Sequence, residues 1–365
     1  MKPEYRTWGP RPAARAPRSR RRRVLAALTW TLTGVVALGA TGLGFVYLKL
    51  DGNIAGVDIN GALGTHRPAD TSNGSVDILV LGSDSRAGKN SEYGQDSGTA
   101  RSDTAMIVHV NAGHDRAQIV SIPRDTLVAR PPCRKDGQRV PPDPHAMFNS
   151  AYQAGGPVCA VKTVEKLTGV RMDHYVEVDF TGFKHLIDTL GGVPMTTHEP
   201  IHDQESHLRL KAGEHVLNGE QALALVRTRH GVGNGSDLGR IKLQHAFLSA
   251  LIERVHGVGL FSDPRQLYDL ADTATSALTT DSELDSIPEL TGLAGTMKDL
   301  SADDVQMATM PVRYDPDNPN RVLPLEHKCR QVWKALRQDR PIPRSALRHT
   351  ATSDTDIGDV VGTQE

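Results

Sequence analysis

Short apolar runs alternate with longer amphipathic segments from residue 76 onward, and this alternation limits the possible folds most strongly. The short runs are typical of buried strands, since they are brief and stop at turn-forming residues such as Gly82 and Pro123. The longer segments have the apolar spacing of helices. The expected strands are 76–81, 104–110, 118–122, 175–178 and 305–311, and the expected helices are 158–168, 181–190, 218–226, 238–255, 266–278, 284–298 and 330–337. The alternation predicts a three-layer α/β/α domain with a central mixed sheet.

Arginine residues stand at or near the ends of these apolar runs, and most have an aspartate close by in the sequence. Such an arginine places a permanent, forked cation at the rim of a core, where it can hold phosphate oxygens through paired hydrogen bonds. The arginines are Arg86, Arg101, Arg124, Arg227, Arg229 and Arg240, and the aspartates are Asp84, Asp103, Asp125 and Asp237. This pattern predicts a polyanionic ligand together with a metal ion. The alternative is that each aspartate only pairs with its neighbouring arginine.

The expected helix 238–255 has an unusual polar start on its apolar side. Arg240 and Gln244 fall within the stripe that Phe247 and Leu251 form. An inward arginine is costly unless it is paired, so the stripe predicts a polar cleft at this end of the helix, where the helix dipole also favours an anion. The alternative is that the start of the helix overhangs solvent.

Asp84 and Asp103 have no His or Cys close by in the sequence. Their oxygen atoms suit Mg²⁺, which prefers to bridge a carboxylate to a substrate phosphate.

The N-terminal residues are basic and precede an uncharged apolar segment, Val24 to Leu48. As a helix this segment would be roughly 37 Å long, enough to span a bilayer. The positive-inside rule then places the N-terminus in the cytoplasm and residues 50–365 outside the cell membrane. A cleaved signal peptide is the alternative, and it exports the same domain. The expected regions are a cytoplasmic basic tail (1–23), a single transmembrane helix (24–48), an extracytoplasmic spacer (49–75), a catalytic domain (76–345, with its core at 76–257 and an extension at 258–345) and a disordered tail (346–365).

Three cysteines fit an exported domain. Cys133 and Cys159 flank a Pro-rich segment expected to be a loop, 130–145, and an oxidising compartment would allow them to form a disulfide. Cys329 would then remain single; three unrelated thiols are the alternative. The formal net charge of −1 excludes a basic field over the whole protein. The Arg-rich stretch within residues 11–23 is too short for a folded DNA-binding module, so no nucleic-acid partner is expected.

These segments resemble the LytR-CpsA-Psr family of cell-wall proteins. The basic, Pro-rich N-terminus and the C-terminal extension are similar to those of actinobacterial members. The matching stretches follow in order over about residues 76–255: Asp77 to Arg86, Arg101 to Thr104, Ser121 to Asp125, Phe148 to Tyr152 with Gly155 and Gly156, Asp188 to Val193, Leu217 to Leu223, Arg227 to Arg229, and Asp237 through Arg240 to Gln244.

The resemblance implies a phosphotransferase, dependent on Mg²⁺ or Mn²⁺, that passes a glycopolymer from a polyprenyl-pyrophosphate carrier to peptidoglycan. The implied partners are this carrier-linked glycopolymer, peptidoglycan and membrane lipid. The implied catalytic residues are Asp84, Asp103 and Arg124, with Asp84 and Asp103 as metal ligands, and the implied pyrophosphate-lipid pocket comprises Arg86, Arg101, Arg124, Arg227, Arg229, Asp237, Arg240 and Gln244. Many relatives carry a lysine where this chain has Met147. A lipid-pyrophosphate hydrolase, a membrane-bound transcriptional regulator and a non-catalytic lipid-binding wall protein remain as alternatives.

Overall fold

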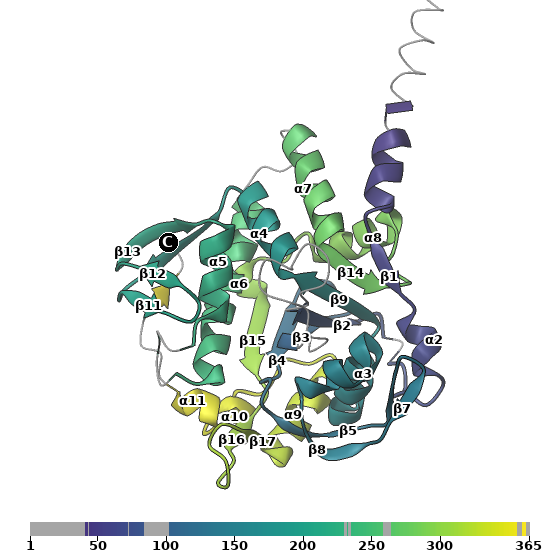
Figure 1. Cartoon of the computed structure of the whole chain (residues 1–365), viewed down its shortest axis with the longest axis vertical. Coiled ribbons are helices and arrows are strands. Elements are labelled where there is room, and N and C mark those ends of the chain that lie inside the picture. The colour runs from purple at the N-terminus through teal and green to yellow at the C-terminus, as the bar shows by residue number, and fades with distance from the viewer. Residues whose placement is uncertain are drawn as a thin grey trace, which may run out of the picture. The chain divides into compact units, whose positions relative to one another are not determined.

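A mixed sheet of seven strands lies at the centre of the larger of two structural units, Leu50–Glu365 (Figure 1). The computed structural model describes residues 41–42, 44–71, 73–83, 102–229, 232, 235–257, 264–355 and 360–362, without the side chains of Ser102, Asp103, Pro264 and Asp354. The strand order is β1 (Ala55–Val57), β14 (Leu278–Asp281), β9 (His174–Asp179), β2 (Val76–Ser83), β3 (Ser102–Val110), β4 (Ala117–Ser121) and β15 (Val305–Thr309). β2 runs parallel to β9 and antiparallel to β3.

Helices cover both faces of this sheet, because side chains alternate between the two faces along each strand. Leu79 and Leu81 of β2 join a core with α3 (Ser150–Thr168) and α9 (Glu326–Arg337). Val80 of the same strand faces α4 (Phe180–Thr189), α5 (Gly219–Arg227) and α6 (Asp237–Gly257). The expected α/β fold with a central mixed sheet is therefore confirmed.

The remaining elements pack around this framework (Figure 1). They are α7 (Pro264–Ala277), α8 (Ile287–Met297), a short 3-10 helix (Ala302–Asp304), α10 (Arg344–Leu347), the small sheet of β13 (Gly213–Leu217), β10 (Val193–Thr197) and β18 (Val361–Gly362), and the hairpins β11 (Ile201–Asp203) with β12 (Leu208–Leu210) and β16 (Val312–Tyr314) with β17 (Val322–Pro324).

The expected spacer, 49–75, is wrong for much of its length. β1 pairs in parallel with β14, and α2 (Ile59–Leu63) buries Ile59 and Leu63 in the main core. The Asp58 side chain caps α2 by accepting a hydrogen bond of 2.8 Å from the Gly61 amide. The two elements are too short to show a periodic pattern, so the surrounding Gly and Asn residues dominated the prediction.

Two further predictions are also corrected. The segment 130–145 is not an irregular loop: β5 (Leu127–Arg130) pairs with β8 (Asp143–Met147), and β6 (Cys133–Lys135) pairs with β7 (Gln138–Val140). The expected disordered tail, 346–365, contains α11 (Ala351–Asp354) and β18, which adds to the edge of β10. Both segments are polar, so their local sequence does not predict regular structure. Tertiary contacts determine their conformation instead.

The smaller unit is Met1–Lys49, and its described residues, 41–42 and 44–49, are helical. Most of the expected membrane segment, 24–48, lies outside the described residues. Within the described ranges, no helix combines the length and the apolar character that crossing a bilayer requires.

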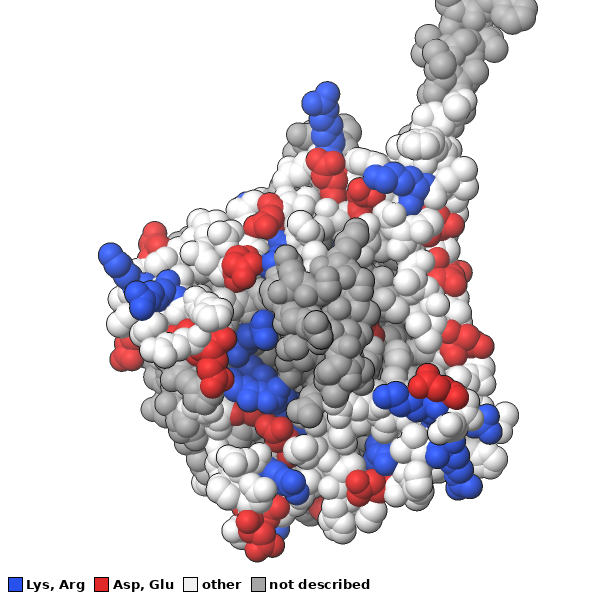
Figure 2. Space-filling view, viewed as in Figure 1, with Lys and Arg blue, Asp and Glu red and all other residues white. Residues whose placement is uncertain are grey.

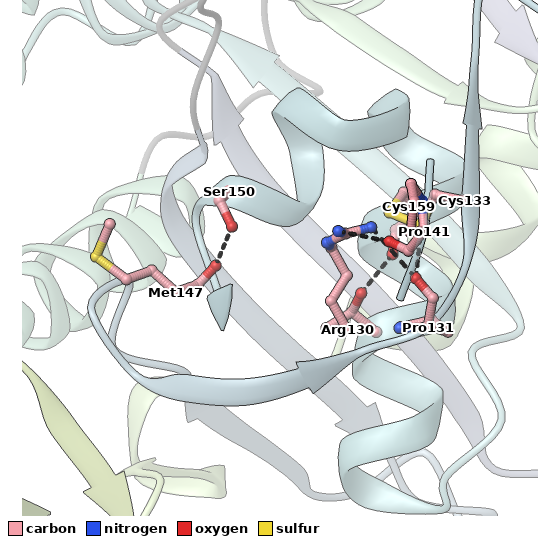
Figure 3. Close-up of a disulfide and its surroundings, with 8 residues drawn as sticks. Arg130, Pro131, Cys133, Pro141, Met147, Ser150 and Cys159 are labelled. Carbon is pink, nitrogen blue, oxygen red and sulfur yellow. Dashed lines mark hydrogen bonds between the residues drawn. A yellow bond between two sulfur atoms is a disulfide. The ribbon is translucent and has the colours of Figure 1, made fainter. Parts of the chain in front are cut away.

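A disulfide joins Cys133 of β6 to Cys159 of α3, the pair suggested by the sequence (Figure 3). α3 is interrupted at Gly155 and Gly156, where the φ angle of Gly156 is 62°. A Cβ atom on Gly155 would lie only 2.7 Å from the Arg134 carbonyl oxygen. The absence of a side chain at Gly155 therefore lets β6 pack directly on the helix and brings the two cysteines together.

We expect loss of this disulfide to lower the free energy of unfolding by about 3 kcal/mol, since it closes a loop of moderate length in the unfolded chain. The measurement is urea unfolding of the wild type with and without a reductant. A Cys133→Ala/Cys159→Ala variant is the control, because the reductant should not change its stability. Equal stability of the oxidised and reduced wild type would contradict the prediction.

Candidate anion and lipid site

Four arginines from separate stretches of chain line one cavity of about 210 Å³, here called the arginine cavity. Arg124 follows β4, Arg227 ends α5, Arg229 lies two residues later, and Arg240 is in the first turn of α6. Glu205 and Ser206 complete the described lining. Figure 2 shows basic side chains gathered near the centre of this face of the molecule, with acidic side chains at their border. Because like charges gathered in one cavity repel each other, this arrangement favours an anionic ligand with several negative charges.

Asp237 holds two of these arginines in place. Its carboxylate forms an ion pair with Arg240, whose side chain is only 4% exposed, and it accepts a hydrogen bond of 3.2 Å from the Arg124 amide. The Arg124 Nε atom lies 3.9 Å from the same carboxylate. The Pro123 turn at the end of β4 is thus attached to the start of α6. Among the described lining residues, four guanidinium groups outnumber the single carboxylate of Glu205, so the lining carries a net positive charge.

The other two arginines are held by different contacts. The Arg227 guanidinium lies 4.7 Å above the centre of the Phe180 ring, a cation–π geometry. The Arg229 amide donates a hydrogen bond of 2.8 Å to Asp203, and the other oxygen of that carboxylate accepts from the Glu205 amide at 2.8 Å. Asp203, Glu205, Ser206 and Phe180 were missed by the sequence analysis. The first three belong to a short polar turn that has no motif to mark it.

An apolar cavity of about 250 Å³ adjoins the arginine cavity and lies between the sheet and helices α4, α5 and α6. Arg227 and Arg240 line both cavities. The apolar lining consists mainly of Val80, Met106, Val178, Phe183, Leu186, Leu223, Phe247, Leu248 and Leu251. An apolar cavity with cations at its mouth is suited to an amphipathic molecule that has an anionic head.

Gln244 lines the apolar cavity together with Arg240, and both side chains are buried. The Gln244 amide donates hydrogen bonds to the Thr104 hydroxyl at 3.1 Å and to the Val226 carbonyl at 2.9 Å. It therefore fastens α6 to β3 and to the end of α5. The neighbouring His245 adds no charge here, because burial lowers its pKa to about 4.

A third and larger cavity of about 710 Å³, here called the hairpin cavity, shares Arg124 and Arg229 with the arginine cavity. The end of β16 and the loop that follows it also line this cavity, with Tyr314, Asn318, Asn320 and Arg321. Met147, the position at which the sequence analysis noted a departure from the family resemblance, also lines this cavity. Figure 3 shows the Met147 side chain directed away from the disulfide, while its carbonyl accepts a hydrogen bond of 2.6 Å from Ser150.

The proposed metal ligands fall largely outside the described part of the chain. Of the two proposed ligands, Asp84 lies outside it, and for Asp103 only the backbone is described. The predicted site residues Arg86 and Arg101 also lie outside it. Ser83, which precedes Asp84, pairs with Ser102, which precedes Asp103, beside a register shift in the β2–β3 ladder. The oxygen donors of two aspartates fit the preference of Mg²⁺.

Among the described residues, one other group has the composition of a metal site, His174, Asp281 and Glu283. Asp281 is already engaged there. Its carboxylate accepts hydrogen bonds of 2.8 Å from the amides of Tyr175 and Glu283 and lies 3.2 Å from the His174 ring nitrogen. Burial acts to raise the pKa of Asp281, but the hydrogen bonds from His174 and from the Tyr175 and Glu283 amides outweigh it and lower that pKa overall. This group stabilises the start of β9 and is not part of the arginine site.

The fold and these cavities define an α/β protein in which an apolar cavity adjoins a cluster of arginines. The chain belongs to the LytR_cpsA_psr family, whose model matches residues 46–338.

Solved and curated relatives agree with this assignment. The chain is 32% identical to the "Probable cell wall biosynthesis protein LcpB" of Corynebacterium glutamicum, over 73% of this chain and 62% of that protein. It is 31% identical to the Bacillus subtilis "Polyisoprenyl-teichoic acid--peptidoglycan teichoic acid transferase TagT", over 60% of this chain and 66% of that one. The matches thus span somewhat under two thirds of these relatives. The crystal structure of B. subtilis TagV is similar with a TM-score of 0.57 at 27% identity, over 73% of this chain and 98% of that chain.

Proposed function

We propose that this protein is a phosphotransferase that moves a glycopolymer from a polyprenyl-pyrophosphate carrier to a peptidoglycan hydroxyl during cell-wall assembly. The observation that carries the proposal is the direct contact between the arginine cavity and the apolar cavity through Arg227 and Arg240. A polyprenyl pyrophosphate has the same two parts, an apolar chain and a doubly phosphorylated head. The name of the related protein TagT describes a reaction of this class.

In the proposed reaction, the hydroxyl oxygen of a peptidoglycan sugar attacks the phosphorus atom next to the glycan. A new phosphorus–oxygen bond forms, the bond to the bridging oxygen breaks, and polyprenyl monophosphate leaves. Negative charge grows on both phosphates, so fixed guanidinium groups stabilise this transition state. Asp237 keeps Arg124 and Arg240 oriented before substrate arrives. Asp84 or Asp103 would accept the hydroxyl proton.

Mg²⁺, held by Asp84 and Asp103, would supply further charge neutralisation at the phosphates. We also propose that residues 24–48 span the cell membrane once, with residues 1–23 in the cytoplasm and the catalytic domain outside. This arrangement would keep the apolar cavity near its membrane-borne substrate.

The proposal is tested with the full-length protein in detergent, supplied with Mg²⁺, a radiolabelled polyprenyl-pyrophosphate glycan and purified peptidoglycan. Covalent label on peptidoglycan together with release of polyprenyl monophosphate would support it. Release of the glycan phosphate into water, without transfer, would instead support a hydrolase. Absence of both binding and turnover would overturn the proposal.

Removal of divalent cations is expected to abolish transfer, and added Mg²⁺ or Mn²⁺ should restore it. The arginines alone cannot replace a metal ion that the two carboxylates bind. An Asp103→Asn variant should show little restoration. Asp303→Asn, an exposed and distant aspartate, is the matched control. Thermal unfolding with and without chelator shows whether the fold itself is unaffected. Full transfer in excess chelator would contradict the prediction.

A further inference from the structure

Part of the hairpin cavity is lined by residues that have no role in the proposed reaction. The end of β16 and the loop that follows it bring Tyr314, Asn318, Asn320 and Arg321 into the same cavity as Arg124 and Arg229. This loop lies far in sequence from the other site residues but within the part of the chain that the family model matches, 46–338. At about 710 Å³, the cavity has room for a small oligosaccharide rather than a single ion.

Backbone contacts fix the loop against the arginine site. The Val322 amide donates a hydrogen bond of 3.3 Å to the Asp125 carbonyl, and Val322 forms a parallel bridge with Thr126. Within the loop, the Asp315 amide bonds to the Arg321 carbonyl at 3.0 Å, and the Asn320 amide bonds to the Asn318 side chain at 3.1 Å. The loop wall is therefore organised before any ligand arrives, which lowers the entropic cost of binding.

The side chains on this wall suit a carbohydrate. Tyr314 is 38% exposed, and its ring combines an apolar face with a hydroxyl group. The apolar face can pack on the C–H face of a sugar ring. Amide and guanidinium groups such as those of Asn318 and Arg321 can bind sugar hydroxyls in several orientations. Arg124 and Arg229 line the same cavity, so a phosphate next to the sugar would meet their positive charge.

The order of the three cavities matches the order of the parts of the proposed donor. The apolar cavity meets the arginine cavity at Arg227 and Arg240, whereas the hairpin cavity meets it at Arg124 and Arg229. The proposed donor has the same order: lipid, diphosphate, glycan. We propose that the hairpin cavity is a glycan subsite that binds the first sugars of the donor, with Tyr314 and Asn318 as specificity-determining residues. This inference rests on the proposed function.

The test compares two ligands of the full-length protein in detergent, a polyprenyl diphosphate without sugar and the same lipid diphosphate carrying a disaccharide. We expect a Tyr314→Ala/Asn318→Ala variant to bind the disaccharide-linked ligand about tenfold more weakly, and the sugar-free ligand as the wild type does. Arg313→Ala is the matched control, since Arg313 is exposed on the same strand but does not line the cavity. Thermal unfolding of each variant verifies that it is folded.

Several results would overturn the subsite. Unchanged affinity of a folded variant for the disaccharide-linked ligand would do so, and so would an equal loss for both ligands. A loss of binding only for a soluble peptidoglycan fragment would assign the sugar to the acceptor instead of the donor. If the wild type bound neither lipid diphosphate, the proposed function itself would fail.

Discussion

Replacing Arg227 with alanine is expected to lower the rate of glycopolymer transfer by roughly 100- to 1,000-fold, the usual cost of removing one fixed group that stabilises transition-state charge. Arg227 lines both the arginine cavity and the apolar cavity, so its guanidinium lies where the lipid and the diphosphate would meet. It is exposed at the end of α5, and its main packing contact is the face of Phe180. The fold should therefore tolerate the change. The measurement is transfer of labelled glycan to peptidoglycan at saturating substrate.

Arg209→Ala provides the control, because Arg209 is exposed on β12 and does not line any of the three cavities. Arg240→Ala would be harder to interpret. Arg240 is buried and paired with Asp237, so its removal would also leave a buried carboxylate with weaker compensation. An Arg227→Ala protein that melts like the wild type and transfers glycan at a similar rate would remove this arginine from the mechanism.

Filling the apolar cavity should also eliminate activity. Val178 of β9 lines this cavity, which has a volume of only about 250 Å³, and a Val178→Trp substitution would occupy a large share of it. We expect binding of a long-chain polyprenyl diphosphate to fall by at least about 100-fold, since the chain loses most of its buried apolar contact. A short-chain prenyl diphosphate, which needs less of the cavity, should lose much less affinity.

The same exchange at an exposed strand position, Val216→Trp on β13, serves as the control because Val216 is 61% exposed. The two variants are compared by isothermal titration with long and short lipids, after thermal unfolding has shown that both are folded. Equal affinity of Val178→Trp and Val216→Trp for the long lipid would show that the chain binds elsewhere.

Local pattern was sufficient to predict much of the framework. The runs that contain Leu79, Ile107 and Val120 consist mostly of apolar residues, and this composition alone predicted that they are buried strands. All three residues are buried in the core beside the sheet. The inward position of Arg240 and Gln244 followed from helical spacing, which holds over the 21 residues of α6. Long, regular elements repeat their signal over several turns, so small errors at their ends do not change the prediction.

The parts that failed are those in which distant contacts decide the structure. β1 and α2 are stabilised by β14 and by the main core, so their own Gly- and Asn-rich sequence does not indicate order. The hairpin cavity depends on the approach of the β16–β17 loop to Asp125, which no local pattern near Tyr314 marks. The polar turn with Glu205 enters the site only because Asp203 binds the amide of Arg229. Such contacts depend on tertiary geometry, which the periodicity of a sequence does not predict.

The attachment of the β16–β17 loop through the main-chain amide of Val322 has an evolutionary consequence. A loop that is held by its backbone can exchange its side chains while keeping its position. Substitutions at Asn318 or Asn320 can thus change which sugar is preferred without moving Arg124. Under the proposed function, related proteins that differ mainly in this loop would bind different sugars while they keep the same phosphate chemistry.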